Sequence, residues 1–199
     1  YALASKAVSQ GAELFMGGEV RQIVLENGRA VAAKYEHNGQ MSQTSFRILI
    51  GADGASSITS RSLGIDRSKC EAIPTVQYVM VNCKIPEKEM IRLYFGDDVA
   101  PKGYAWIFPK NEYAANVGIG VQGFPAKPFL GKFIRNHPGI FGKASIIKEG
   151  GGLVPVGNQI QTVKENVMLC GDSAGQVIQV TGAGMGTSMI AGSIAGETA

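Results

Sequence analysis

The chain has 199 residues, of which 45% are hydrophobic and 18% charged, a composition that is typical of a folded protein and excludes a disordered one. Its net charge of +3 includes no lysine- or arginine-rich block, which argues against nucleic acid as a partner. No apolar run is long enough to span a membrane and no signal peptide opens the chain, so we expect a cytoplasmic protein whose contact with a membrane is either peripheral or made by parts outside this sequence.

The three cysteines are far apart in the sequence and odd in number. Cys70, Cys83 and Cys170 form no C-x-x-C pair that could bind zinc or carry out redox chemistry. They are expected to be free, partly buried thiols in a reducing compartment, and no metal site is predicted.

The first quarter of the chain is expected to form one helix followed by hairpins. The helix spans residues 1–8 and ends near Gly11. Strands are predicted at 12–16, 18–26, 30–37 and 43–50, with Asn-Gly turns at 27–28 and 38–39. The end of the last strand is apolar at consecutive positions, which predicts a strand buried on both faces.

The remaining elements predict two interleaved domains in a mixed α/β fold. Helices are expected at 58–63, 125–136 and 184–196, the last packed closely on its neighbours, and strands at 75–84, 91–95, 104–109, 114–121, 150–156 and 167–170. Two strands of a parallel sheet, 47–50 and 167–170, flank a long and mostly antiparallel insert. Two domains built from alternating segments would give this order.

Three glycine-rich segments come next to apolar strands or to the last helix, at 51–54, 171–175 and 181–187. At the carboxyl end of a strand such a segment presents backbone amides and an aspartate to a ligand. Before a helix, exposed amides favour negative charge. Each segment alone has a plainer interpretation: a turn with an N-capping aspartate for the first, and a hinge before a packed helix for the last.

In this order and spacing the three segments resemble the FAD enzymes built like p-hydroxybenzoate hydroxylase. The resemblance implies an FAD/NAD(P)-binding Rossmann-like domain, formed by 1–66 and 157–199, interleaved with an antiparallel-sheet substrate domain at 67–156. It implies that Asp172 binds the flavin ribitol and that Val20 contacts adenine through its backbone. The implied cofactor-binding residues are Val20, Gly51, Ala52, Asp53, Gly54, Gly171, Asp172, Ser173, Ala174, Gly175, Gly182, Gly184, Met185 and Gly186.

A fourth motif is Pro-Lys-Gly-Tyr-Ala-Trp-Ile-Phe-Pro at 101–109. Strand alternation places Tyr104, Trp106 and Phe108 on one face, where they could wall an apolar tunnel or form an ordinary aromatic sheet core. The motif resembles the segment of geranylgeranyl reductases that lines the prenyl-chain pocket. The resemblance implies that Tyr104, Trp106, Phe108 and Pro109 bind substrate.

The predicted function is that of an FAD-dependent oxidoreductase that reduces isolated double bonds of prenyl-lipid chains. Its electron donor, ferredoxin or NAD(P)H, is left open, and no side chain is assigned as catalytic. One alternative is a flavin monooxygenase or halogenase that acts on an aromatic substrate. Another is a fragment that is inactive alone, because the first dinucleotide-binding segment, the N-terminal strand–Gly-x-Gly-x-x-Gly–helix unit that holds the pyrophosphate in such enzymes, is not in the sequence.

Overall fold

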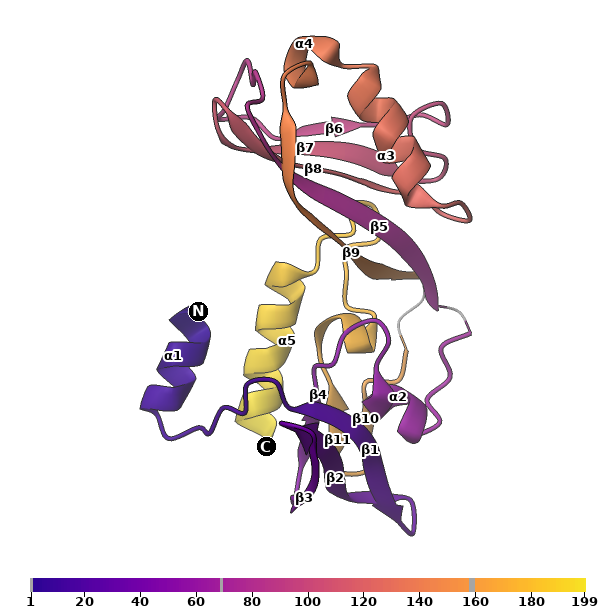
Figure 1. Ribbon diagram of the computed structural model, residues 1–199. Coiled ribbons are helices and arrows are strands. Elements are labelled where there is room, and N and C mark those ends of the chain that lie inside the picture. The colour runs from indigo at the N-terminus through magenta and orange to yellow at the C-terminus, as the bar shows by residue number, and fades with distance from the viewer. Residues whose placement is uncertain (1, 69, 158–159) are drawn as a thin grey trace.

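The computed structural model describes residues 2–68, 70–157 and 160–199. Within these ranges the chain forms two three-stranded sheets and one five-stranded sheet. Figure 1 shows the five-stranded sheet with its helices in the upper part of the molecule, and the two smaller sheets in the lower part. This mixed α/β architecture confirms the predicted fold class.

The first sheet is an antiparallel meander. Helix α1 (Ala2–Ser9) precedes its strands β1 (Glu19–Glu26), β2 (Arg29–His37) and β3 (Gln40–Ser45). Asn27 and Asn38 adopt left-handed backbone conformations, with φ of 51° and 53°, which a tight turn between strands requires. The strand predicted at 12–16 is wrong: this segment pairs with no strand of the described chain, and Phe15 instead packs its ring 6.0 Å from that of Tyr35.

The second sheet contains the predicted parallel pair. Strand β4 (Leu49–Gly51) lies parallel to β11 (Val167–Leu169), and β10 (Val163–Lys164) lies antiparallel to β11. The single strand predicted at 43–50 is therefore two strands in different sheets, because the chain leaves the meander after Ser45. The expected burial on both faces is also wrong, since Ile50 is 39% exposed.

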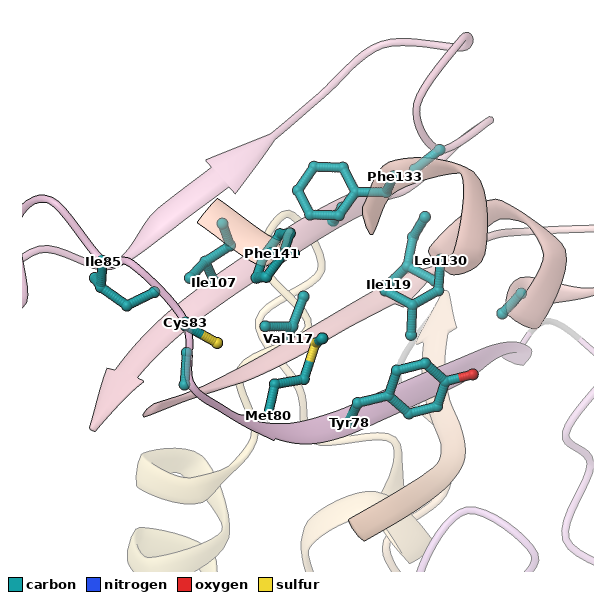
Figure 2. Close-up of a cluster of buried hydrophobic side chains, with 14 of the residues drawn as sticks. Tyr78, Met80, Cys83, Ile85, Ile107, Val117, Ile119, Leu130, Phe133 and Phe141 are labelled. Atoms are coloured by element: carbon teal, nitrogen blue, oxygen red, sulfur yellow. The ribbon is translucent and has the colours of Figure 1, made fainter. Parts of the chain in front are cut away.

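The five-stranded sheet is antiparallel and has the order β6-β7-β8-β5-β9. Its strands are β5 (Cys70–Val81), β6 (Arg92–Tyr94), β7 (Tyr104–Asn111), β8 (Ala114–Gly120) and β9 (Ser145–Gly157). Helices α3 (Ala126–Arg135) and α4 (Pro138–Phe141) cover one face and enclose the main hydrophobic core, shown in Figure 2. The other face carries the aromatic side chains of β7 and lies opposite residues 179–185.

A short helical element follows each of the two parallel strands, and a longer helix comes last. Helix α2 (Ile58–Ser62) follows β4, and the 3-10 helix η1 (Gly171–Ala174) follows β11 and leads to α5 (Met185–Thr198). We predicted that this last helix packs closely on its neighbours, which is wrong: within the described structure Ala195 is its one buried residue. Its apolar residues occur all around the helix, and its main contacts are with η1. No helix in the described ranges has the length and apolar character needed to cross a membrane.

Candidate functional site

The segment after β4 is held by Asp53. The Ser57 hydroxyl donates to one carboxylate oxygen of Asp53 at 2.6 Å, and the Thr59 amide donates to the other at 2.9 Å. Burial alone would raise the pKa of the Asp53 carboxyl, but these hydrogen bonds lower the pKa below its usual value. Both carboxylate oxygens are thus engaged at the start of α2, while Ala52 and Gly54 face the neighbouring cavity.

The segment after β11 turns at Gly171, whose φ of +68° favours glycine. The Ser173 hydroxyl is fully buried and lies 2.6 Å from the Gly51 carbonyl oxygen and 2.7 Å from that of Cys170. It thereby ties the two parallel strands together at their carboxyl ends. In the described structure the Asp172 carboxylate accepts no hydrogen bond, and burial raises its pKa. Its oxygens are available to a ligand.

A cavity of 690 Å³ lies at these strand ends, beside α5. We call it the Asp172 cavity, after the carboxylate in its wall. Most of the lining residues have small side chains. A Cβ at Gly184 would lie 3.1 Å from an Asp172 carboxylate oxygen, so a glycine at this position lets the backbone approach the carboxylate closely. The lining residues are Ile50, Ala52, Gly54, Cys170, Gly171, Asp172, Gly182, Gly184, Met185, Ser188, Met189 and Gly192.

An apolar cavity of 600 Å³ lies against the open face of the five-stranded sheet. We call it the aromatic cavity. Trp106 lies flat over Gly118, where a Cβ would come within 2.3 Å of the ring, and its indole N–H donates to the Gln77 side chain at 3.0 Å. Its lining residues are Ile73, Thr75, Phe95, Lys102, Gly103, Tyr104, Trp106, Phe108, Gly120, Val154, Val156, Gln179, Val180, Thr181, Gly182, Ala183, Gly184 and Met185.

The glycine loop, residues 178–184, separates the two cavities. Ile178 and Ala183 form an antiparallel bridge that closes the loop on itself. The Gln179 side chain accepts a hydrogen bond from the Gly157 amide at 2.8 Å and donates one to the Gly157 carbonyl, which fixes the loop to the end of β9. The Tyr104 hydroxyl donates to the Thr181 carbonyl, and burial raises its pKa, so the phenol remains a donor at neutral pH. The loop is thus held from two strands of the sheet.

The two cavities share one wall. Gly182, Gly184 and Met185 line both of them. A ligand in the Asp172 cavity and a ligand in the aromatic cavity would therefore meet at this wall, next to the first turn of α5. Amides in the first turn of a helix lack acceptors within the helix, so they present partial positive charge at the same place.

The structure brings most of the predicted site residues together. Ala52, Gly54, Gly171, Asp172, Gly182, Gly184 and Met185 line the Asp172 cavity, and Tyr104, Trp106 and Phe108 line the aromatic cavity. Other predicted residues lie outside these linings. Gly51 packs on Thr59 and Leu169, Ala174 is buried, and Gly175 has a left-handed φ of +65°. Pro109 and Asp53 each follow a lining residue in the sequence, Phe108 and Ala52. Their roles stay predictions, as do those of Val20 on β1, Ser173 and Gly186.

Sequence reasoning missed two groups of lining residues. Val154 and Val156 alternate along β9 with their side chains in the aromatic cavity, and Phe95 follows β6. On α5, Ser188 and Met189 line the Asp172 cavity one turn after Met185. The alternation in β9 and the helical spacing in α5 are signals in the sequence, but neither says which face meets a ligand.

Comparison with known proteins identifies the family. Residues 1–109, more than half of the chain, match the family model described as FAD binding domain. The chain belongs to this FAD-binding family. Residues 71–154 of the FAD-binding chain match the model of the geranylgeranyl reductase catalytic domain, which confirms the resemblance predicted from the 101–109 motif.

Relatives of known name agree with this assignment. The chain is 39% identical to digeranylgeranylglycerophospholipid reductase 2 of Methanococcoides burtonii and 37% identical to the corresponding reductase of Methanosarcina acetivorans. Each match covers 100% of this chain and 50% of the relative, so the chain spans about half the length of the curated relatives it matches.

Solved structures agree as well. A geranylgeranyl bacteriochlorophyll reductase-like protein from Thermoplasma acidophilum is 32% identical, with a TM-score of 0.87 over 98% of this chain and 51% of that chain. The flavin-dependent brominase Bmp2, at 17% identity and a TM-score of 0.71 over 98% of this chain and 54% of that chain, shares the fold.

The residues of the Asp172 cavity fit FAD, the cofactor that the family implies. A flavin cofactor presents sugar-alcohol hydroxyls and a pyrophosphate, which need a free acceptor and close approach to backbone amides. The Asp172 carboxylate supplies the acceptor, and the thin wall at Gly171, Gly182 and Gly184 supplies the approach. The first turn of α5 adds donors. The prediction of FAD is thus supported by the family and by this chain's own geometry.

Proposed function

We propose that this chain forms the flavin- and substrate-binding part of a cytoplasmic FAD-dependent oxidoreductase that reduces isolated C=C bonds of prenyl-lipid chains. The observation that carries the proposal is the wall of Gly182, Gly184 and Met185, which is shared by the Asp172 cavity, whose free carboxylate suits FAD, and the aromatic cavity, which suits a hydrocarbon chain. The names and identities of the relatives support the same substrate class. The proposal divides the chain into FAD-binding segments 1–66 and 157–199 and a substrate segment 67–156.

The chain's own residues would bind, orient and keep water out. Bound FAD, once reduced by the electron donor, would supply a hydride to one carbon of the double bond, and a proton from water or from a residue outside this chain would add to the other carbon. Asp172 would accept hydrogen bonds from the ribitol hydroxyls, and amides of the first turn of α5 would stabilise negative charge on the flavin. Tyr104, Trp106 and Phe108 would hold the prenyl chain against the thin wall and exclude water from the reacting carbon atoms.

The proposal includes two partners. The first is an external electron donor, either ferredoxin or NAD(P)H. The second is a membrane that supplies the lipid through peripheral contact.

The proposal can be tested with the complete protein that carries this chain. We expect it to purify yellow and, with dithionite as reductant, to add two hydrogen atoms to each double bond of a digeranylgeranyl lipid, measured by mass spectrometry. In Asp172→Ala, which removes hydrogen bonds to a charged acceptor, FAD affinity should fall at least tenfold, about 1.4 kcal/mol or more. Asp97→Asn, in an exposed loop, is the matched control.

Two outcomes would contradict the proposal. Unchanged FAD affinity in Asp172→Ala would show that the cofactor binds elsewhere. An oxygen- or halide-containing product from an aromatic substrate, with no reduction of the prenyl lipid, would assign the enzyme to the flavin monooxygenases or halogenases instead.

A further inference from the structure

The end of the five-stranded sheet farthest from the glycine loop is formed by residues 82–84, 110–113 and 143–148, which we call the basic tip. One hydrogen bond joins the first two segments, from the Cys83 amide to the Tyr113 carbonyl at 2.9 Å, and a second ties the first segment to α4, from the Lys84 amide to the Ile140 carbonyl at 2.9 Å. The register pairs Val81 with Ser145 across β5 and β9. In Figure 1 this end lies near α4, away from the two smaller sheets. The basic tip is therefore one continuous surface.

The basic tip carries a strong excess of positive charge. Lys84, Lys110, Lys143 and Lys148 are all exposed, and none forms an ion pair with another residue of the described structure. The tip's one acidic residue, Glu112, is already paired with Lys88 at 2.7 Å. From residue 113 to residue 148 the sequence contains five lysines and arginines and no acidic residue. This surface suits an anionic partner.

Large apolar side chains project between these lysines. Tyr113 is 68% exposed, Ile146 51% and Ile147 64%. The two isoleucines point outward because the strand pairing skips Ile147: Val79 pairs with Lys148 and Met80 with Ile146. Such a β-bulge turns the local side chains away from regular alternation. Two adjacent apolar side chains on the edge strand β9 are therefore exposed to solvent.

We propose that the basic tip is a docking site for bilayers that contain anionic phospholipids. Exposed apolar side chains insert between lipid headgroups, and each nearby lysine adds attraction to the negative surface. An acidic protein surface would pair with the four lysines equally well, but it would leave Ile146 and Ile147 without an apolar environment to enter. The bilayer therefore accounts for both features of the surface.

Docking at the basic tip would also bring the bilayer close to the aromatic cavity. Phe108, which lines that cavity, lies two residues before Lys110 on β7. The row from Tyr104 to Phe108 would then lead from the membrane surface toward the glycine loop. This route rests on the proposed function, whereas docking itself depends only on the tip.

The test is sedimentation of the complete protein with vesicles of phosphatidylcholine, alone or mixed with phosphatidylglycerol. We expect binding to the mixed vesicles alone, and weaker binding as salt is added. The double variant Lys143→Glu/Lys148→Glu should lower binding roughly tenfold or more, because attraction at two lysines becomes repulsion. Ile147→Ser should lower it severalfold with the charge unchanged.

The matched control is Lys6→Glu/Arg29→Glu, which makes the same change of charge on α1 and β2 and should bind like the unaltered protein. FAD affinity and the thermal midpoint of each variant show that the fold is retained. Equal vesicle binding by the tip and control variants would overturn the inference. So would a protein that binds an acidic protein surface but no vesicles.

These outcomes are distinct from failure of the proposed function. A protein that reduces prenyl lipid in detergent but ignores vesicles keeps the proposed function and loses the docking site. Tip-dependent vesicle binding without prenyl reduction gives the reverse result.

Discussion

Among single residues, Tyr104 contributes to both the aromatic cavity and the glycine loop. Its ring lines the cavity, and its hydroxyl donates to the Thr181 carbonyl. Tyr104→Phe keeps the ring and removes one hydrogen bond, which is worth about 1 kcal/mol. Because the loop forms part of the wall of the Asp172 cavity, we expect the dissociation constant for FAD to rise roughly fivefold. Titration of the complete protein with FAD, followed by flavin fluorescence, measures this change.

Tyr78→Phe is the control for this substitution. It removes a hydroxyl from the opposite, helix-covered face of the same sheet, where the ring belongs to the core in Figure 2. We expect its FAD affinity to match that of the unaltered protein. If both variants bind FAD equally well, the Tyr104 hydroxyl has no part in holding the loop.

The residue scale also shows what the sequence could predict. Alternation placed Tyr104, Trp106 and Phe108 on one face, and the structure puts all three in one cavity. Local pattern could not reveal that Gln179 would bond both backbone groups of Gly157, because these residues are 22 positions apart and meet only through the fold. Asp53 was interpreted from the sequence either as a cofactor-supporting residue or as an N-cap, but the N-cap of α2 is Ser57, and Asp53 supports this cap by accepting hydrogen bonds from the Ser57 hydroxyl and the Thr59 amide.

At the scale of elements, the start of α2 depends on the Asp53 carboxylate. Asp53→Asn replaces one acceptor oxygen by an NH₂ group, which faces the Ser57 hydroxyl or the Thr59 amide. We expect the free energy of unfolding to fall by about 1 kcal/mol at neutral pH. Urea unfolding of the variant and of Glu26→Gln, an exposed carboxylate at the end of β1, provides the comparison.

The pH dependence of this effect has a defined sign. The pKa of Asp53 is lower in the folded state than its usual value of 3.8. The ionised carboxylate therefore stabilises the fold above 3.8, and this contribution is lost as the pH falls through the folded-state pKa. The difference between Asp53→Asn and the unaltered protein should shrink over the same range. A difference that grows as the pH falls would contradict the assignment.

Elements also show where prediction from sequence stops. The parallel pairing of β4 with β11 was predictable, because both strands end in a glycine–aspartate segment. The division of 43–50 between two sheets was not, since an apolar run does not show which strand it will pair with. The openness of α5 was also missed: a helix that is apolar on all sides predicts burial, and the described chain covers only one side of it.

For the molecule as a whole, the wall of Gly182, Gly184 and Met185 links two binding equilibria. A ligand that orders the wall from one side reduces the entropy lost when the second ligand binds on the other. Such coupling is reciprocal: the factor by which a lipid raises FAD affinity equals the factor by which FAD raises lipid affinity. We expect a coupling factor of roughly five or more, within the usual range for linked sites.

FAD titration with and without a fully saturated prenyl lipid, which binds without reacting, measures this factor. Tyr104→Phe should reduce it, and Tyr78→Phe should leave it unchanged. Equal FAD affinities in the presence and absence of the lipid would mean that the wall behaves as a rigid partition. Coupling through the wall has a kinetic benefit. A protein without FAD releases its lipid readily, so the hydrocarbon chain is retained longest when FAD, which can reduce it, is already bound.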